Sequence, residues 1–291
     1  MARKRRAMSA AVLGVIFACY GLARVLEVAP TSIPRTAIVA LDVMSAMVFA
    51  LVHGAQHYRL RGILVFAALC LLVGNALENL SLTTGFPFGH YRFLELMGPK
   101  LFQVPVLLGL AYVGMAYVAW TLARMIVGRP DAPVTGVRLV ALPAAASFIM
   151  VAWDLAQDPV WATVLHGWIW RDGGAWFGVP VSNYFGWFLT VFTIYLLFAL
   201  YVRRYPSPPS SAQANGWPPI LFYALCAGGN VLQLIPAQAA PIVHDAAGTP
   251  WRTAEIVSAS ALVSIFVMGG FVSVASIRLI EERSKRTRII D

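Results

Sequence analysis

The sequence predicts an all-α polytopic membrane helix bundle with about eight transmembrane helices. Its 291 residues are 59% hydrophobic and only 12% charged, and their mean hydropathy is +0.72. Soluble domains carry about 25% charged residues and disordered chains are poor in apolar residues, so both classes are excluded. A membrane helix needs about 20 mostly apolar residues. Stretches of this kind are predicted near Met8–Val28, Thr36–His53, Gly62–Leu82, Leu101–Arg124, Arg138–Asp158, Val181–Val202, Pro218–Pro236 and Thr253–Ile280.

The distribution of the basic residues predicts the orientation of these spans. With the N-terminus inside, 16 of the 22 basic residues fall on inner segments and five on outer segments, and Arg24 lies within the first span. The excess of basic residues on the inner side predicts cytoplasmic termini, with basic tails over residues 1–7 and 281–291. The topology therefore accounts for the net charge of +9, and we expect no nucleic-acid partner. We expect a single integral membrane domain over residues 1–291, located in a bacterial cytoplasmic membrane.

The acidic residues favour the opposite side. Nine of the thirteen fall on the outer side or in the outer half of the bundle. Because acidic residues contribute little to topology, this bias indicates a polar site that opens towards the outer leaflet, although solvated outer loops would also explain part of it. Glu78, Asp154 and Asp158 lie in or at the ends of apolar spans, where a carboxylate usually faces the bundle interior.

Asp154 and Asp158 are four residues apart and share one helix face, and Pro159 is expected to end that helix. Two carboxylates in a low-dielectric cleft repel each other when both are ionised, which favours a protonated form that can act as a general acid. The alternative is a structural pair bonded to Arg24 or to asparagine side chains. Glu78 forms a polar stripe with Asn75 and Asn79, for which interhelical hydrogen bonding and substrate lining both remain open.

Tryptophan is concentrated in one part of the chain. Six of the nine tryptophans fall between Trp153 and Trp187. An interfacial aromatic belt explains some of them, but their density predicts an aromatic outer loop over residues 159–180 that covers the outer end of the bundle. Aromatic ring faces can also stabilise a cation.

The sequence lacks the motifs that several classes of membrane protein require. None of the three lysines lies mid-membrane, which excludes a retinal Schiff base, and five histidines are too few for a membrane di-iron oxygenase. The Asp154–Asp158 spacing is not accompanied by the second aspartate-rich motif with which a prenyltransferase holds Mg²⁺ and diphosphate. We therefore expect neither a metal nor a cofactor. Carboxylic acids, water and aromatic rings in an apolar pocket fit the protonation of an alkene.

Two segments resemble the signatures of a known family. The run Leu77–Tyr91 (LENLSLTTGFPFGHY) resembles the first signature of the carotenoid biosynthesis membrane proteins typified by the CruF-type carotenoid 1',2'-hydratases. Asp158-Pro159, followed by Gly167–Trp170 (GWIW) and Phe177–Trp187 (FGVPVSNYFGW), resembles the second. The bisanhydrobacterioruberin hydratases are similar. The resemblance implies hydration of the terminal C1',C2' double bond of a ψ-end group, as in lycopene or γ-carotene, to give a 1'-hydroxy carotenoid.

The residues and the resemblance together give a mechanistic hypothesis. Asp154 or Asp158 protonates C2'. Trp168, Trp170 and Trp187 shield the cation at C1'. Glu78 or Asn183 positions the attacking water. The long polyene is expected to enter laterally from the lipid. The predicted catalytic residues are Asp154, Asp158 and Glu78, and the predicted substrate-binding residues are Asn79, Tyr91, Trp168, Trp170, Asn183 and Trp187.

Three other functions remain open. A carotenoid or terpene cyclase would use the same protonation chemistry, with an alkene in place of water. A transporter would use a polar site between broken helices. A structural protein would support other carotenoid enzymes. The expected partners are a lipophilic carotenoid, the lipid bilayer and, as a candidate class, other carotenoid enzymes.

Overall fold

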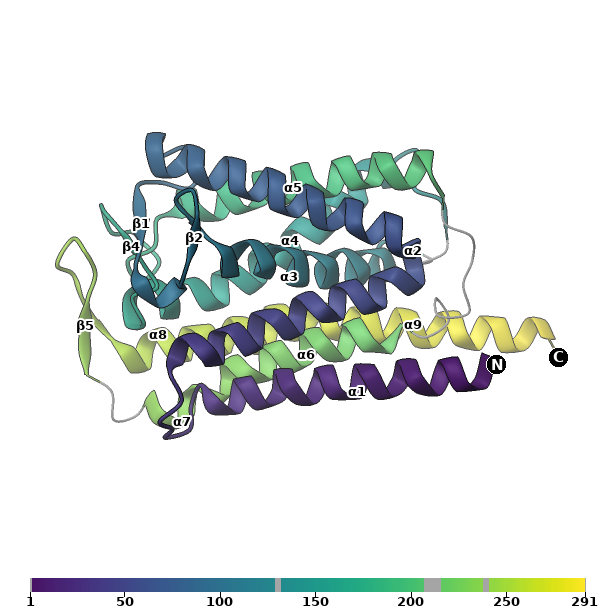
Figure 1. Cartoon of the computed structure of the whole chain (residues 1–291), viewed down its shortest axis with the longest axis horizontal. Coiled ribbons are helices and arrows are strands. Elements are labelled where there is room, and N and C mark those ends of the chain that lie inside the picture. Colours follow the sequence, from purple (N-terminus) through teal and green to yellow (C-terminus); the bar gives the residue numbers. More distant parts are fainter. Residues whose placement is uncertain (1, 129–131, 207–215, 238–240, 291) are drawn as a thin grey trace.

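The computed structural model describes residues 2–128, 132–206, 216–237 and 241–290. The described chain is a bundle of long helices with short two-stranded sheets at one end (Figure 1). The helices are α1 (Ala2–Leu26), α2 (Arg35–Thr84), α3 (Val106–Ile126), α4 (Arg138–Pro159), α5 (Val181–Arg204), α6 (Trp217–Leu232), α7 (Leu234–Ala237), α8 (Thr253–Leu262) and α9 (Gly269–Ile290). The short elements are β1 (Tyr91–Phe93), the 3-10 turn η1 (Glu95–Met97), β2 (Lys100–Leu101), β3 (Val104–Pro105), the π-helical turns η2 (Val160–Val164) and η4 (Val263–Met268), β4 (Trp168–Trp170), β5 (Ile242–His244) and β6 (Pro250–Arg252).

Helix α2 consists of two helical halves that run in opposite directions. At Arg59 the backbone leaves helical geometry (φ 57°, ψ 169°), and Figure 1 shows α2 reversing its direction, with the two halves diverging from the turn. Gly54 lets the two halves approach closely beside the turn, because a Cβ atom at that position would lie 2.4 Å from Cδ1 of Ile63 in the second half. The two halves correspond to the predicted spans Thr36–His53 and Gly62–Leu82.

The predicted helical membrane bundle is confirmed. In the described part of the chain six helices are long and apolar enough to cross a membrane, α2 among them, and α1 adds a shorter apolar stretch over Ala10–Leu26. Helices α8 and α9 form one such segment through η4. The number of eight spans and the side of the membrane on which the termini lie stay predictions. Figure 1 does show the start of α1 and the end of α9 at the same end of the bundle.

The predicted tails are helical in the described part of the chain. Helix α1 begins at Ala2 and α9 continues to Ile290, so residues 2–7 and 281–290 extend these helices. Met1 and Asp291 lie outside the described residues.

The outer surface of the bundle is apolar. Large aliphatic and aromatic side chains project outwards from several helices, including Leu72, Phe148, Phe185, Leu221 and Phe266. Soluble monomers rarely expose apolar surface on this scale, whereas lipid tails accommodate it. Helix α3 lies at the other extreme, with Tyr112, Tyr117 and Trp120 fully buried at the centre of the core.

Pro159 is the last residue of the α-helix α4, as predicted, but the helical path of the chain does not stop there. The chain continues from α4 through Pro159 into η2, so that the helical segment extends to Val164. Proline lacks the N–H that would bond to the carbonyl four residues earlier. Here the indole N–H of Trp176 donates to that carbonyl, on Leu155, at 3.1 Å. The aromatic segment thus compensates for the missing donor, and the predicted loop 159–180 begins after η2.

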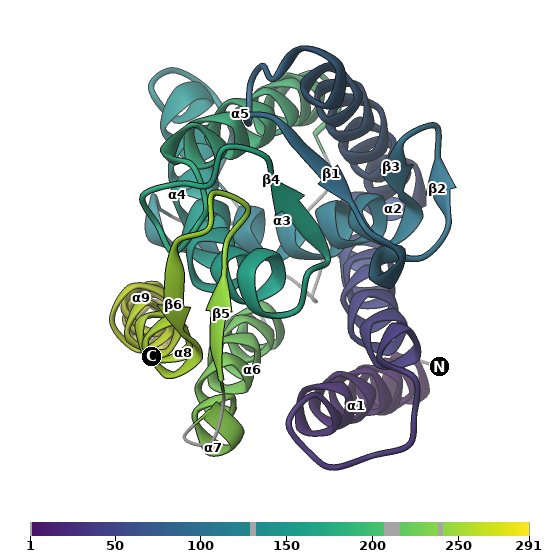
Figure 2. The same cartoon turned by 90° about the vertical axis from the view of Figure 1, so that its left-hand side faces the viewer.

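The short sheets lie at the end of the bundle opposite the termini (Figure 1). Strands β1 and β4 pair antiparallel, as do β2 with β3 and β5 with β6. Figure 2 shows β1 and β4 lying across this end of the bundle. They come from the two segments that carry the family resemblance, and their pairing brings these segments together.

Candidate active site

The pairing of β1 with β4 aligns four aromatic side chains on one face. Tyr91 lies opposite Trp170, and Phe93 lies opposite Trp168. Side chains alternate between the two faces of a strand, so these four point to the same side while Arg92 points away. The ring centroids are 4.7 Å apart for Tyr91 and Trp170 and 6.2 Å apart for Phe93 and Trp168.

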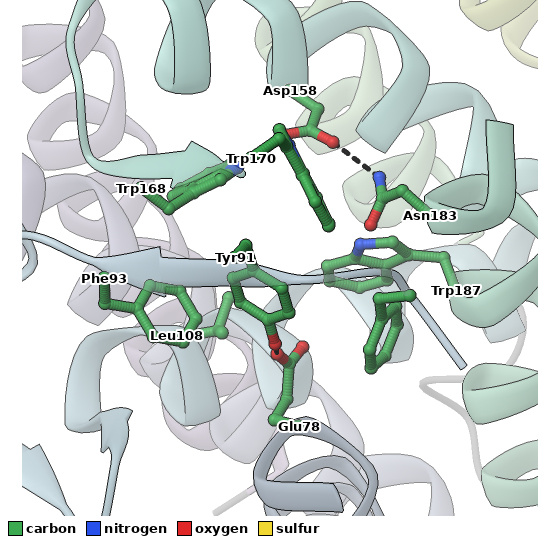
Figure 3. Close-up of a pocket in the computed structure, with 10 residues that line it drawn as sticks. Glu78, Tyr91, Phe93, Leu108, Asp158, Trp168, Trp170, Asn183 and Trp187 are labelled. Carbon is green, nitrogen blue, oxygen red and sulfur yellow. Dashed lines mark hydrogen bonds between the residues drawn. The ribbon is translucent and has the colours of Figure 1, made fainter. Parts of the chain in front are cut away.

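This aromatic face forms one wall of a cavity of about 290 Å³. Helices α2, α3, α4 and α5 supply the remaining walls (Figure 3). The cavity is lined by Glu78, Phe88, Tyr91, Phe93, Leu108, Asp158, Trp168, Trp170, Asn183 and Trp187. The cavity therefore brings together Glu78 and six other residues that the sequence predicted to be catalytic or substrate-binding. These six are Tyr91, Asp158, Trp168, Trp170, Asn183 and Trp187.

The loop before β1 is held against α5 by close backbone packing. A Cβ atom at Gly186 would lie 2.6 Å from Cδ1 of Phe88, so only glycine lets the loop approach α5 this closely. Ser182 Oγ donates to the Phe88 carbonyl at 2.8 Å, and Ser81 Oγ accepts from the Phe88 N–H at 3.2 Å. These contacts fix the Phe88 ring in the cavity wall.

Asn183 links the two aspartates. Its Nδ2 donates to Oδ2 of Asp154 at 3.1 Å and also to Oδ2 of Asp158. Both hydrogens of the amide are thereby used, and the two flanking carboxyl groups identify the nitrogen side of the amide. Asp154, Asp158 and Asn183 are 5%, 2% and 1% exposed, so the cluster lies away from bulk solvent.

Trp168 holds the second oxygen of Asp158. Its indole N–H donates to Oδ1 at 2.7 Å, so each oxygen of Asp158 accepts one hydrogen bond. In the described part of the chain no hydrogen bond reaches Oδ1 of Asp154. The two carboxyl groups are thus in different environments, although they are one helical turn apart.

Glu78 forms a separate cluster with two tyrosines. The hydroxyl of Tyr112 donates to Oε1 at 2.7 Å, and the hydroxyl of Tyr91 donates to Oε2. Burial, and then the neighbouring Glu78 carboxyl, raise the pKa of Tyr91 well above its usual value, which keeps its hydroxyl proton in place as a donor. Tyr112 was not among the predicted site residues. Its position inside an apolar span was the available signal, because a buried tyrosine hydroxyl needs a hydrogen-bond partner.

A second cavity, of about 660 Å³, adjoins the first. Asp158, Trp168, Trp187 and Leu108 line both cavities. Asp154 lines only the second cavity, together with tryptophan rings and the polar side chains of Asp42 and Gln157. The Asp154–Asp158 pair therefore lies where the two spaces meet.

Asn79 was predicted to bind substrate, and Arg24 or an asparagine was considered as a structural partner of the aspartate pair. Asn79 lies outside both cavities. Its Nδ2 donates to the side chain and carbonyl of Asn75, and its Oδ1 accepts from the Gln103 N–H. Its role in binding substrate stays a prediction.

The aspartate pair is bonded to Asn183, and an asparagine was one of the structural partners considered. Arg24, the other partner considered, instead donates to Asn230 at 2.6 Å. Within the described ranges no group of three histidine, cysteine or acidic residues is placed to hold a metal.

Comparison with known protein families shows to which family the chain belongs. Residues 35–249 match the family described as carotenoid biosynthesis protein. The chain belongs to the carotenoid biosynthesis protein family. The match includes the whole site from Glu78 to Trp187, so the cavity and its carboxyl groups lie inside the family's shared region.

One curated relative of this carotenoid biosynthesis family member is a bisanhydrobacterioruberin hydratase from Haloarcula japonica. It is 31% identical over 128 residues, which cover 44% of this chain and 41% of the relative. The chain thus aligns with about two fifths of that protein. No solved structure matches this chain.

Proposed function

We propose that this carotenoid biosynthesis family member is a carotenoid hydratase, which adds water across the terminal C1',C2' double bond of a ψ-end group of the lycopene or γ-carotene type. The observation that carries the proposal is the buried Asp154–Asn183–Asp158 cluster, placed against an aromatic cavity. The hydratase named among its relatives supports the same chemistry. No cofactor takes part in the proposed reaction.

Asp154 is the proposed proton donor. Asp158 has both oxygens held by N–H donors, from Trp168 and Asn183, and N–H donors favour the ionised form of a carboxyl group. Asp154 accepts from Asn183 at Oδ2 only, so Oδ1 can carry a proton towards the second cavity. Asp154 then transfers this proton to C2', and the positive charge develops at the tertiary carbon C1'.

The tryptophan rings are the proposed stabilisers of this cation. A cation within about 6 Å of a ring centroid is attracted to the ring face. Trp168 and Trp187 line both cavities, and Trp153 lies beside Trp187 with ring centroids 6.0 Å apart. These rings flank the aspartates without offering a nucleophile that could capture the cation.

Water completes the proposed reaction. The indole N–H of Trp170 is buried near Asp158 but makes no hydrogen bond of normal geometry among the described residues, and the Asn183 oxygen points into the first cavity (Figure 3). A buried unpaired N–H of this kind is commonly satisfied by water. The water oxygen bonds to C1' and its proton passes to Asp158. Return of that proton to Asp154 restores the starting state, so one alkene and one water give one tertiary alcohol.

The substrate is proposed to arrive from the lipid. Val43 and Leu107 line the second cavity and are half-buried, while their sequence neighbours Met44 and Val106 are exposed, at 41% and 42%. This wall between α2 and α3 therefore adjoins the apolar exterior of the bundle. A polyene end that passes here reaches Asp154 without crossing water.

Expression in a lycopene-producing bacterium tests the proposal, with the pigment separated by chromatography and weighed by mass spectrometry. The expected result is a new carotenoid heavier than its precursor by the mass of one water. A new product of unchanged mass would indicate cyclisation and overturn hydration. Unchanged pigment, with the chain present in the membrane fraction, would overturn both.

A further inference from the structure

A third cavity, of about 740 Å³, lies among the ends of several helices. Its lining includes Glu27, Arg35, Gln233 and Thr253, which stand just after α1, at the start of α2, after α6 and at the start of α8. Figure 1 shows these helix ends at the end of the bundle opposite the termini. Arg35 is exposed. This cavity therefore adjoins the aqueous surface at that end of the bundle.

The third cavity and the second share two lining residues, Val39 and Trp161. Val39 is only 4% exposed, and its side chain belongs to the wall between the two spaces. We call Val39 and Trp161 the neck.

A polar stripe on α4 leads from the neck to the proposed proton donor. Asp154, Gln157, Asp158 and Trp161 all line the second cavity, and their spacing of three and four residues places them on one face of the helical segment. The stripe is about 10 Å long at 1.5 Å per residue. Asp42, from α2, lines the same cavity, so polar groups from two helices bound it.

Two polar atoms close to the neck make no hydrogen bond to another group of the protein, although both side chains take part in ion pairs. Nε of Arg24 and Oδ1 of Asp42 are buried and make no hydrogen bond within the described part of the chain. Oδ1 of Asp42 forms an ion pair with Nη1 of Arg24 at 3.7 Å, a separation beyond direct hydrogen-bond distance. Buried polar atoms in a space large enough for water are commonly bridged by it.

The proposed reaction consumes one water in each turnover, and a substrate that arrives through lipid brings none. We propose that water reaches the Asp154–Asp158 pair from the third cavity, through the neck and along the α4 polar stripe opposite Asp42. This inference rests on the proposed hydratase function. It assigns Val39, Trp161 and Asp42 to water supply, a role separate from proton transfer.

The fate of the cation distinguishes water supply from acid catalysis. In the experiment, the enzyme is equilibrated in D₂O and mixed with less than one equivalent of lycopene. Transfer of the deuteron then breaks the O–D bond of Asp154 and forms a C–D bond at C2'. Captured by water, the cation becomes the alcohol. Without water, it loses H⁺ from C2' or from a methyl group on C1' to the Asp154 carboxylate, and the recovered alkene then carries deuterium.

Val39→Phe is the variant that narrows the neck. The expected result is a fall of about tenfold or more in alcohol formed, equivalent to about 1.4 kcal/mol in the capture step, with a matching rise in deuterium in the recovered alkene. Ile38→Phe is the control, because Ile38 is equally buried at 4% but lines neither cavity. It is expected to hydrate as the wild-type chain does.

Asp42 supplies a second, independent variant pair. Asp42→Leu removes the polar group and should shift the product ratio as Val39→Phe does, whereas Asp42→Asn can still bind water and should restore hydration. Both variants remove the ion pair of Asp42 with Arg24 and leave Glu27 as the ion-pair partner of Arg24, so they differ in polarity and not in charge. Wild-type product ratios in Val39→Phe and Asp42→Leu would overturn the route, as would loss of alcohol and deuterium together. A wild-type chain that forms no alcohol would overturn the hydratase function and this inference with it.

Discussion

The indole N–H of Trp168 donates to Oδ1 of Asp158 across 2.7 Å, which joins a strand residue of the aromatic wall to a helix residue of the carboxyl pair. We predict that Trp168→Phe keeps a ring in the cavity but lowers kcat about tenfold, since a hydrogen bond to a charged group contributes about 1.5–3 kcal/mol. Steady-state kinetics with lycopene in detergent measures the effect. Trp161→Phe is the comparison, because its ring stacks on Trp168 at 6.0 Å, its N–H makes no bond to Asp158, and the smaller ring does not narrow the neck. Equal losses in both variants would contradict a specific role for the Trp168 N–H.

The two aspartates are predicted to differ when each is replaced by asparagine. Asp154→Asn removes the proposed acid and should lower kcat by about 10²–10⁴, the usual contribution of general acid catalysis, and deuterium incorporation at C2' should disappear with it. Asp158→Asn should lower alcohol formation but retain deuterium incorporation, because Asp154 can still protonate the alkene. Single-turnover experiments in D₂O separate the two. Full activity in both variants would exclude this pair as the proton-transfer groups.

Asn183 is predicted to act as a positioning residue for the pair. In Asn183→Leu, both carboxyl groups lose the shared amide donor, so kcat should fall by about 10²-fold, a loss typical of misplaced catalytic groups, while KM changes little. Asn183→Gln carries the same amide on a longer chain and should recover part of kcat. A rise in KM with unchanged kcat would instead place Asn183 in substrate binding alone.

Trp176 is predicted to stabilise the fold through the Leu155 carbonyl. Trp176→Phe leaves this carbonyl without its donor at 3.1 Å and should lower the free energy of unfolding by about 1–3 kcal/mol. Pro159→Ala supplies a backbone N–H at the position where proline has none, so the double variant should recover most of the loss. Thermal unfolding in detergent measures all members of the cycle. Strictly additive effects would show that the two positions do not share the carbonyl.

The raised pKa of Tyr91 predicts that the free energy of unfolding decreases at alkaline pH. The pKa of Tyr91 is raised in the folded chain, so above about pH 10, the ordinary tyrosine value, the unfolded chain loses the proton while the folded chain retains it. The stabilising contribution of Tyr91 is therefore complete below pH 10 and is lost as the pH rises further. The stability difference between wild type and Tyr91→Phe should shrink between pH 9 and pH 11. A constant difference across this range would contradict the raised pKa of Tyr91 in the folded chain.

The sequence by itself determined the class of fold and most members of the site. Hydrophobic runs of membrane-spanning length are a local property of the chain, and the cost of burying carboxyl groups in lipid made Glu78, Asp154 and Asp158 conspicuous. The spacing of Asp154 and Asp158 placed them on one helix face without reference to any other element.

The tertiary structure decided which of these residues act together. Asn183 reaches the aspartates because α5 packs on α4, and Tyr91 meets Trp170 because β1 pairs with β4; no local pattern encodes either contact. Tyr112 joined Glu78 in the same way. The π-helical continuation beyond Pro159 was not predicted, because a local rule about proline could not include a donor, Trp176, that lies seventeen residues further along the chain. Local composition sets which groups must avoid lipid, whereas packing between distant segments sets which partner each of them finds.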